Sequence, residues 1–249
     1  GGLAGDVAGF IASTYGRGMP FIQIPTTLLS MVDASIGGKT AINLEEGKNL
    51  VGTFYQPMAV ISDIDSLTTL PARELNSGWA EAIKHSLILD DNLFRIFENK
   101  FDSLSKLETE ISLDVIKRSI SIKAEVVSQD VRETKGIRSI LNYGHTVGHA
   151  IESVTGYDSF LHGEAVSIGM MAAARLSNKM GLLDDDSLLR HERVLKSFGL
   201  PVACPGLSVD KIMSRIQVDK KTSGGDVKWV LLESIGKAIT NVNIPNQLV

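Results

Sequence analysis

The chain has little cysteine, few aromatic residues and no strong excess of charge. Of its 249 residues, one is cysteine, 6% are aromatic, and the formal net charge is −4. Cys204 alone cannot form an intramolecular disulfide and is typical of a reducing compartment. Basic runs interleaved with aromatic residues are absent, which argues against nucleic-acid binding. Uninterrupted apolar runs fall short of the ~20 residues of a membrane helix. We therefore expect a soluble, cytoplasmic protein without nucleic-acid or membrane partners.

The first six residues form an unusual beginning. Gly1-Gly2-Leu3-Ala4-Gly5-Asp6 reads as a glycine turn of the kind that follows a strand and opens a helix facing a phosphate. Because no strand precedes this turn, we expect the chain to be a fragment that starts within the motif. Two spaced glycines are by themselves a weak signal.

The first seventy residues alternate short strands, helices and glycine turns. This pattern is typical of an α/β nucleotide-binding domain, and Leu70-Pro71 is its natural boundary. We thus predict an incomplete Rossmann-like domain at residues 1–70. Its predicted parts are a helix at 5–15, strands at 21–24 and 59–62, and glycine turns at 36–40 and 47–49.

Beyond the boundary the apolar spacing becomes helical. A mainly α-helical metal- and substrate-binding domain is therefore predicted at residues 71–249, so the fold class is an α/β part followed by a helical part. The predicted helices cover 73–89, 113–131, 138–154, 163–181, 185–198 and 209–217, and a hairpin around Gly236 joins 228–232 to 239–242.

Three of the five histidines fall within eighteen residues, at His145, His149 and His162. The first two lie four apart, on one face of a helix. Two histidines with one carboxylate are a common ligand set for catalytic zinc. Glu81 lies inside an apolar helical segment, where an unpaired carboxylate is costly to bury, and a metal would remove that cost. In the alternative reading, Glu81 forms an internal salt bridge with Lys84 or Lys123.

Spacing leaves open which of His145 and His149 binds the metal. The other could carry protons, because imidazole titrates near neutral pH. His85 and His191 have polar sequence neighbours, so we interpret them as surface residues or as residues behind the metal ligands.

Cations are concentrated around the same motifs. In a chain of negative net charge, this concentration favours an anionic small-molecule ligand. If residues 138–154 form one helix, then Arg138, Asn142 and His145 share a face that could hold a carboxylate or a polyol. The cations are Arg17, Lys39, Lys48, Lys84, Lys123, Arg138, Lys220 and Lys221.

Seven motifs in this order resemble the 3-dehydroquinate synthase family, and together they cover nearly all of the chain. The family's N-terminal portion, which holds the first strands of its nucleotide-binding domain, is missing. The matching motifs are Gly2-x-x-Gly5-Asp6, Pro25–Leu29, Asp33–Thr40, Gly47–Gly52, Ala80–Lys84, Leu141–His149 and Leu161–Glu164.

The resemblance implies a lyase of the shikimate pathway that uses NAD and zinc or cobalt. It would convert 3-deoxy-D-arabino-heptulosonate 7-phosphate into 3-dehydroquinate and phosphate through transient oxidation by NAD, phosphate elimination, reduction and an intramolecular aldol step. Glu81, His145 and His162 would bind the metal, and His149 would handle protons. The substrate would contact Lys84, Lys123, Arg138, Asn142 and one of Lys220 and Lys221, of which we select Lys221.

By the same resemblance, Lys39 and Asn49 would lie near the substrate phosphate, and Arg17 would reach it from the other subunit of a homodimer. NAD would contact Gly2, Leu3, Ala4, Gly5, Asp6, Thr26, Thr27, Asp33, Lys39, Lys48, Ser66, Leu67, Thr68 and Thr69. Three alternatives remain: another sugar-phosphate cyclase, a metal-dependent alcohol dehydrogenase of similar architecture, and an inactive fragment.

Overall fold

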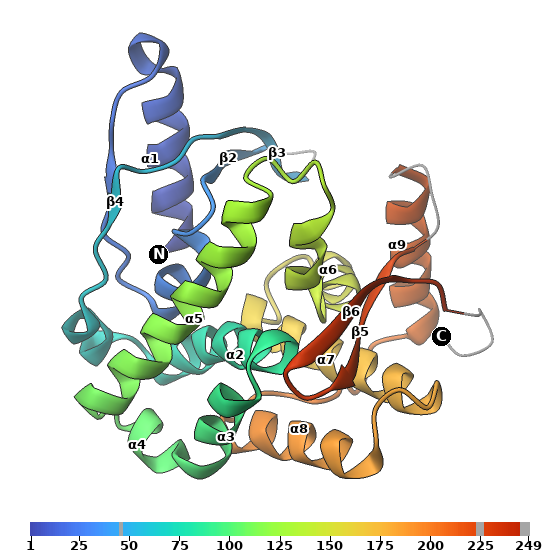
Figure 1. Ribbon diagram of the computed structural model, residues 1–249. Coiled ribbons are helices and arrows are strands. Elements are labelled where there is room, and N and C mark those ends of the chain that lie inside the picture. The colour runs from blue at the N-terminus through green and yellow to red at the C-terminus, as the bar shows by residue number, and fades with distance from the viewer. Residues whose placement is uncertain (45–46, 223–226, 245–249) are drawn as a thin grey trace.

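A computed structural model describes residues 1–44, 47–222 and 227–244 (Figure 1). Helix α1 and the short strands form one end of the molecule. The remaining helices pack below and beside them, and the β5–β6 hairpin lies in front of α7 (Figure 1). This arrangement confirms the predicted α/β part followed by a mainly helical part. No described helix is both long enough and apolar enough to cross a membrane.

The α/β part is built around a parallel strand pair, β1 (Ile22–Gln23) and β4 (Ala59–Val60). Both strands are confirmed, although each is shorter than predicted. Helix α1 (Gly2–Thr14) packs closely beside β1. The absence of a side chain at Gly5 permits this approach, since a Cβ there would lie only 2.7 Å from Oε1 of Gln23. The predicted stop after α1 is also found, since the turn η1 (Tyr15–Arg17) follows and Gly16 has φ 56°.

A long antiparallel hairpin was not predicted. It pairs β2 (Lys39–Leu44) with β3 (Gly47–Phe54). The turn at Gly37 and Gly38 is confirmed, with φ values of 111° and 67°. The turn predicted at residues 47–49 is wrong, because these residues open β3. Glycine also occurs in strands where another part of the chain approaches the backbone closely. A glycine in the sequence does not by itself distinguish such a strand from a turn.

The helical part largely follows the predicted spacing. Its long helices and its hairpin are confirmed, whereas the short helices α3 and α4 were missed. Asp90 caps α3 by accepting a hydrogen bond from the amide of Leu93. The elements are α2 (Ala72–Leu89), α3 (Asp91–Asn99), α4 (Phe101–Ser105), α5 (Thr109–Gln129), α6 (His145–Val154), α7 (His162–Lys179), α8 (Asp185–Ser197), α9 (Val209–Thr222), β5 (Trp229–Ser234) and β6 (Lys237–Val242); the single turns are η2 (Ser30–Ala34), η3 (Ile64–Thr69) and η4 (Ile137–Asn142).

The helix predicted over residues 138–154 is broken in two. Residues 137–142 form the turn η4, and α6 begins only at His145. Between them Gly144 has φ 80°, and a Cβ there would lie 2.8 Å from the amide nitrogen of Met170. The chain therefore turns sharply at a position that only glycine fills without strain. For this reason Arg138, Asn142 and His145 do not share one helical face, and that expectation is wrong.

One continuous apolar core joins the two parts. Leu28, Met31 and Leu67 from the α/β part are buried in the same cluster as the apolar face of α2. At its centre the ring of Trp79 meets Phe97 and Phe198 edge to face, with centroid distances of 6.0 and 6.1 Å. The division at Leu70-Pro71 thus runs through shared packing and stays a prediction.

Candidate metal and substrate site

Two helices that carry histidines pack unusually closely. On α6 a Cβ at Gly148 would lie 3.2 Å from the carbonyl oxygen of Ala165 on α7. A Cβ at Gly169 would collide with the carbonyl of Gly144. This approach brings the His145 and His162 rings to a centroid distance of 5.4 Å.

Helix α2 meets the beginning of α7 in the same manner. The amide of Gly163 donates to Oγ of Ser77 at 3.0 Å, and Arg73 forms a bidentate pair with Glu164. Glu164 also accepts a hydrogen bond from the amide of Leu161, which caps α7. These contacts fix the start of α7, where His162 lies, against the helix that carries Glu81.

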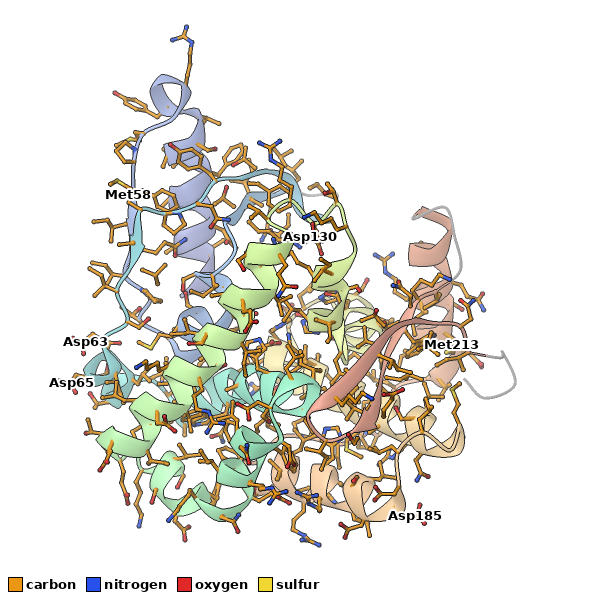
Figure 2. The ribbon with its side chains drawn as sticks, viewed as in Figure 1. Met58, Asp63, Asp65, Asp130, Asp185 and Met213 are labelled. Carbon is orange, nitrogen blue, oxygen red and sulfur yellow. The ribbon has the colours of Figure 1, made fainter. Side chains whose placement is uncertain are left out.

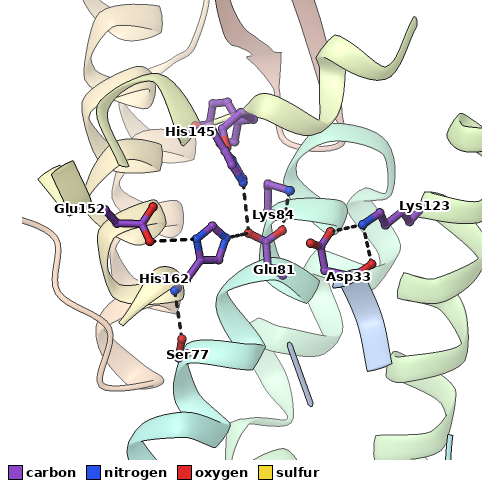
Figure 3. Close-up of polar contacts among 10 residues, drawn as sticks. Asp33, Ser77, Glu81, Lys84, Lys123, His145, Glu152 and His162 are labelled. Atoms are coloured by element: carbon purple, nitrogen blue, oxygen red, sulfur yellow. Dashed lines mark hydrogen bonds and ion pairs between the residues drawn. The ribbon is translucent and has the colours of Figure 1, made fainter. Parts of the chain in front are cut away.

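Glu81, His145 and His162 converge on one point (Figure 3). Oε1 of Glu81 lies 3.2 Å from Nε2 of His162 and 3.5 Å from Nε2 of His145. Nδ1 of His145 lies 3.1 Å from the carbonyl oxygen of Tyr143, an acceptor that requires Nδ1 to carry the proton. Nε2 then holds a lone pair. One ligand atom from each of the three residues lies within 4.8 Å of the others, as a metal site requires.

Glu81 is fully buried and nevertheless remains charged. Burial raises the pKa of its carboxyl group, but Lys84 and then His145 hold that pKa well below its usual value. Nζ of Lys84 lies 2.5 Å from Oε2. The salt bridge that we weighed as an alternative to a metal is therefore present with Lys84 and not with Lys123. Because it uses Oε2, Oε1 still faces the two histidines, and both interactions can coexist.

The carboxylates of Glu81 and Glu152 favour a positive charge at His162. Burial lowers the pKa of His162, but contacts with Glu152 and Glu81 outweigh it and raise that pKa to about 10. Burial, followed by the charge of Lys84, holds the pKa of His145 well below its usual value. One imidazole thus attracts a proton while its neighbour keeps a free lone pair, as expected at a site whose charges suit a cation.

Asp33 and Lys123 form a second ion pair beside Glu81. Nζ of Lys123 donates to Oδ1 of Asp33 at 2.6 Å and to its carbonyl oxygen at 2.5 Å. Burial raises the pKa of Asp33, but Lys123 lowers it to about 2. Asp33, predicted to contact NAD, and Lys123, predicted to contact substrate, thus lie together next to the candidate metal ligands (Figure 3).

Of three other predicted substrate residues, His149 lies beside this centre, whereas Asn142 and Arg138 lie in η4. The exposed ring of His149 lies 5.1 Å from that of His145, centroid to centroid. Asn142 is exposed at the end of η4. Arg138 is buried, donates to the carbonyl of Val131 at 3.1 Å, and lies close to Gly37, where a Cβ would come within 2.9 Å of Nη2.

The remaining predicted substrate residues with described side chains lie in the α/β part. Arg17 is exposed in η1, at the far end of α1. Lys39 is exposed and pairs with Glu133, and Asn49 is exposed in β3, where it has φ 58°. The side chains of Lys48, Lys220 and Lys221 lie outside the described residues.

The predicted NAD residues fall on several elements. Residues 2–6 were expected as a turn and instead form the first turns of α1, whose N-terminal end opens on a hollow of ≈ 210 Å³. Thr26 also lines this hollow, whereas Oγ1 of Thr27 accepts a hydrogen bond from the amide of Ser30. Residues 66–69 lie in η3, where the side chain of Leu67 is buried.

His85 and His191 are not surface residues, so the surface interpretation is wrong for both. The other interpretation holds for His85, because one of its ring nitrogens lies within 4.8 Å of a carboxylate oxygen of Glu81, a candidate metal ligand. Both are fully buried, because tertiary packing covers positions whose sequence neighbours are polar. Nδ1 of His85 lies 2.7 Å from Oγ of Ser119, whereas neither ring nitrogen of His191 has a hydrogen-bond partner among the described residues. Burial lowers the pKa of His191 to about 3.

Sequence reasoning missed Glu152. It lies on α6, with Oε1 at 3.5 Å from Nδ1 of His162. A signal was available, since Glu152 follows His145 by seven residues and His149 by three, the spacing of a single helical face. Figure 2 shows the side chains of the molecule on the ribbon, in the view of Figure 1.

The geometry defines a protein with a candidate metal-binding group of one carboxylate and two imidazoles, next to the junction of an α/β part and a helical part. Known proteins specify the class further. Residues 1–77 match the family model of the 3-dehydroquinate synthase N-terminal domain, and residues 78–222 match that of its C-terminal domain. The chain belongs to the 3-dehydroquinate synthase family.

Individual relatives agree. A 3-dehydroquinate synthase of Nitrosospira multiformis is 49% identical over 245 residues, which are 98% of this chain and 67% of that protein. ValA, a 2-epi-5-epi-valiolone synthase of Streptomyces hygroscopicus solved with NAD⁺ and Zn²⁺, is 32% identical with a TM-score of 0.92, over 100% of this chain and 69% of its own. A 2-deoxy-scyllo-inosose synthase complexed with carbaglucose-6-phosphate, NAD⁺ and Co²⁺ is 35% identical with a TM-score of 0.82, over 99% and 67%.

Proposed function

We propose that the chain has the activity of a 3-dehydroquinate synthase and acts on 3-deoxy-D-arabino-heptulosonate 7-phosphate. The observation that carries this proposal is the placement of Glu81, which directs Oε1 to both imidazoles and Oε2 to Lys84. Similarity at 49% to curated 3-dehydroquinate synthases over nearly the whole chain supports the assignment.

The residues present fit a divalent metal held by Glu81, His145 and His162. Both histidines direct Nε2 toward the carboxylate. Glu81, Asp33 and Glu152 carry three negative charges, against two positive charges on Lys84 and Lys123. The raised pKa of His162 adds a proton that balances the remaining negative charge, and a cation bound between the histidines would take the place of that proton. When bound, the metal supplies Lewis-acid polarisation of a substrate oxygen, and NAD supplies reversible hydride transfer.

The neighbouring residues would bind the substrate and move protons. Lys84 and Lys123 are buried cations beside the centre, suited to hydroxyl and carboxylate oxygens. Arg138 and Asn142, the latter exposed at the end of η4, would bind the carboxylate. His149 is solvent-accessible at the edge of the cluster and would exchange a proton with the substrate, which is general acid–base work.

NAD would place its pyrophosphate at the N-terminal end of α1. The backbone amides there carry the positive end of the helix dipole. The side of the adjoining hollow that α1 forms, at Ala4 and Gly5, carries no large side chain, whereas Phe21 and Ile22 line another side. We retain residues 66–69 and Asp33 as further NAD contacts. We also propose a cytoplasmic homodimer in which Arg17 reaches the partner's site, in line with its exposure far from the chain's own centre.

The test supplies the full chain with the heptulosonate phosphate, NAD and Zn²⁺, and follows phosphate and NADH separately. Phosphate release without NADH accumulation is expected, because the cofactor is regenerated in each turnover. Stoichiometric NADH release would identify an alcohol dehydrogenase instead. Absence of both products would identify an inactive fragment.

The alternative is another sugar-phosphate cyclase, a class whose valiolone synthase shares the fold with a TM-score of 0.92 but is only 32% identical, against 49% for the 3-dehydroquinate synthase. The buried guanidinium of Arg138 argues for a substrate that carries a carboxylate. Offering phosphorylated sugars with and without a carboxylate separates the two, because a cyclase of the second kind would release phosphate from the carboxylate-free sugar.

A further inference from the structure

The two candidate histidine ligands are held from behind by different groups. Nδ1 of His145 faces the backbone carbonyl of Tyr143 at 3.1 Å. Nδ1 of His162 faces a side chain, with Oε1 of Glu152 at 3.5 Å (Figure 3). The first acceptor is fixed by the chain itself, whereas the second can be removed by a single substitution.

Glu152 occupies a position where a carboxylate is costly to bury. Its side chain is only 10% exposed, and its neighbours Ala150 and Ile151 are buried in the apolar core. A buried carboxylate is costly unless it is paired. The contact with His162 is one such pairing, in which the carboxylate accepts and a protonated Nδ1 donates.

This direction of donation determines which ring nitrogen is free. If Nδ1–H points to Glu152, then the lone pair of the neutral ring resides on Nε2, which lies 3.2 Å from Oε1 of Glu81. At 3.5 Å the contact is longer than a well-formed N–H···O bond, so it is a weak hydrogen bond for the neutral ring and an ion pair for the protonated ring. A negative group behind the ring also raises the basicity of Nε2, which makes it a stronger electron-pair donor to a metal cation.

We propose that Glu152 is a positioning residue that fixes the tautomer and the orientation of His162, so that Nε2 serves as the metal ligand. The proposal rests on the metal site of the proposed function. Glu152 acts through His162 and touches neither the metal nor the substrate. Carboxylate groups behind metal-binding histidines typically change metal affinity by about 10–100-fold.

The test measures Co²⁺ and Zn²⁺ affinity of the full chain, by titration against a chelator and by the visible spectrum of bound Co²⁺. Glu152→Ala is expected to weaken binding about 10–100-fold and to alter the Co²⁺ spectrum. Glu152→Gln keeps an oxygen that can accept from Nδ1–H, so it is expected to recover part of the affinity and the wild-type spectrum. Glu98→Ala is the matched control, because it also removes a partly buried, paired carboxylate, bound to Arg190.

The outcomes separate this proposal from the proposed function. If the wild-type chain binds a single Co²⁺ that His162→Ala loses, the metal site stands. Wild-type affinity in Glu152→Ala, or equal losses in Glu152→Ala and Glu152→Gln, then overturns the positioning role alone. If the wild-type chain binds no metal that depends on His162, the site itself fails. Imidazole nitrogen NMR adds an independent measurement, since loss of Glu152 is expected to shift the Nδ1 signal of His162.

Discussion

The amide of Gly163 donates to Oγ of Ser77 at 3.0 Å, and this contact joins the helix of His162 to the helix of Glu81. A Cβ at Gly163 would collide with the carbonyl of Ser77. The distance between the two candidate ligands therefore depends on a position that carries no side chain and that lies one residue beyond His162.

Gly163→Ala is expected to push α7 away from α2 and to weaken metal binding. Overpacking of this kind costs about 1–3 kcal/mol of unfolding free energy. Ala172→Gly in the middle of α7 is the control, since it costs about 1 kcal/mol without changing the contact between α2 and α7. Urea unfolding and Zn²⁺ titration of both variants check the prediction. Equal metal affinity in the two variants would show that the approach of the helices does not set the site.

Replacing a proposed ligand is expected to remove the metal. In Glu81→Ala or His162→Ala a three-ligand site loses one donor, so zinc is not retained through gel filtration. In Glu81→Ala the buried Lys84 also loses its partner, which adds a loss of stability that His162→Ala does not share. Elemental analysis measures the zinc content, and full zinc in either variant would contradict the assignment.

His149→Ala is expected to keep zinc and to slow phosphate release. The ring of His149 is exposed and lies 6.4 Å from that of His162, centroid to centroid, consistent with a proton carrier at the edge of the site. Loss of general acid–base catalysis typically costs about 100-fold or more. Zinc content and turnover are measured on the same preparation. Loss of zinc would show that His149 is a ligand and that our division of the histidine pair is wrong.

Sequence patterns located the site but not its surroundings. Glu81 was recognisable because a carboxylate inside an apolar helix needs a partner, and the long helices follow apolar spacing. The break at Gly144 was not, because apolar spacing continues across it and the turn is imposed by the close approach of Met170. The surface interpretation of His85 and His191 was wrong for a related reason, since their sequence neighbours are polar while their own side chains are buried. Burial by distant segments is a tertiary effect that local patterns do not contain.

The Lys123–Asp33 pair illustrates the same limit, since 90 positions separate its members. Lys123→Met is expected to raise the pKa of Asp33 from about 2, because the charge that lowers it is gone. Asp33 contributes stability that is present above its unfolded pKa near 3.8 and is lost as the pH falls toward 2, and the variant would lose that contribution. Removal of this charged hydrogen bond costs about 2 kcal/mol. Urea unfolding at neutral and acidic pH, with Asp33→Asn and the double variant completing the cycle, measures the coupling.

His191 is expected to make the fold acid-sensitive. Burial lowers its folded pKa to about 3, whereas the unfolded chain takes up a proton near pH 6.5. Below pH 6.5 the unfolded state therefore binds the extra proton, and stability falls by up to ~1.4 kcal/mol per pH unit until the pH nears 3. His191→Leu and His191→Gln both remove this titration, so both are expected to reduce the slope of unfolding free energy against pH between about pH 6.5 and 5 by roughly one proton.

The two variants should differ in stability at neutral pH, because Leu fills the apolar surroundings without polar atoms, whereas Gln buries an amide. Unfolding in urea with a chelator present keeps metal release out of the comparison, and an unchanged slope in both variants would show that His191 is protonated in the folded state.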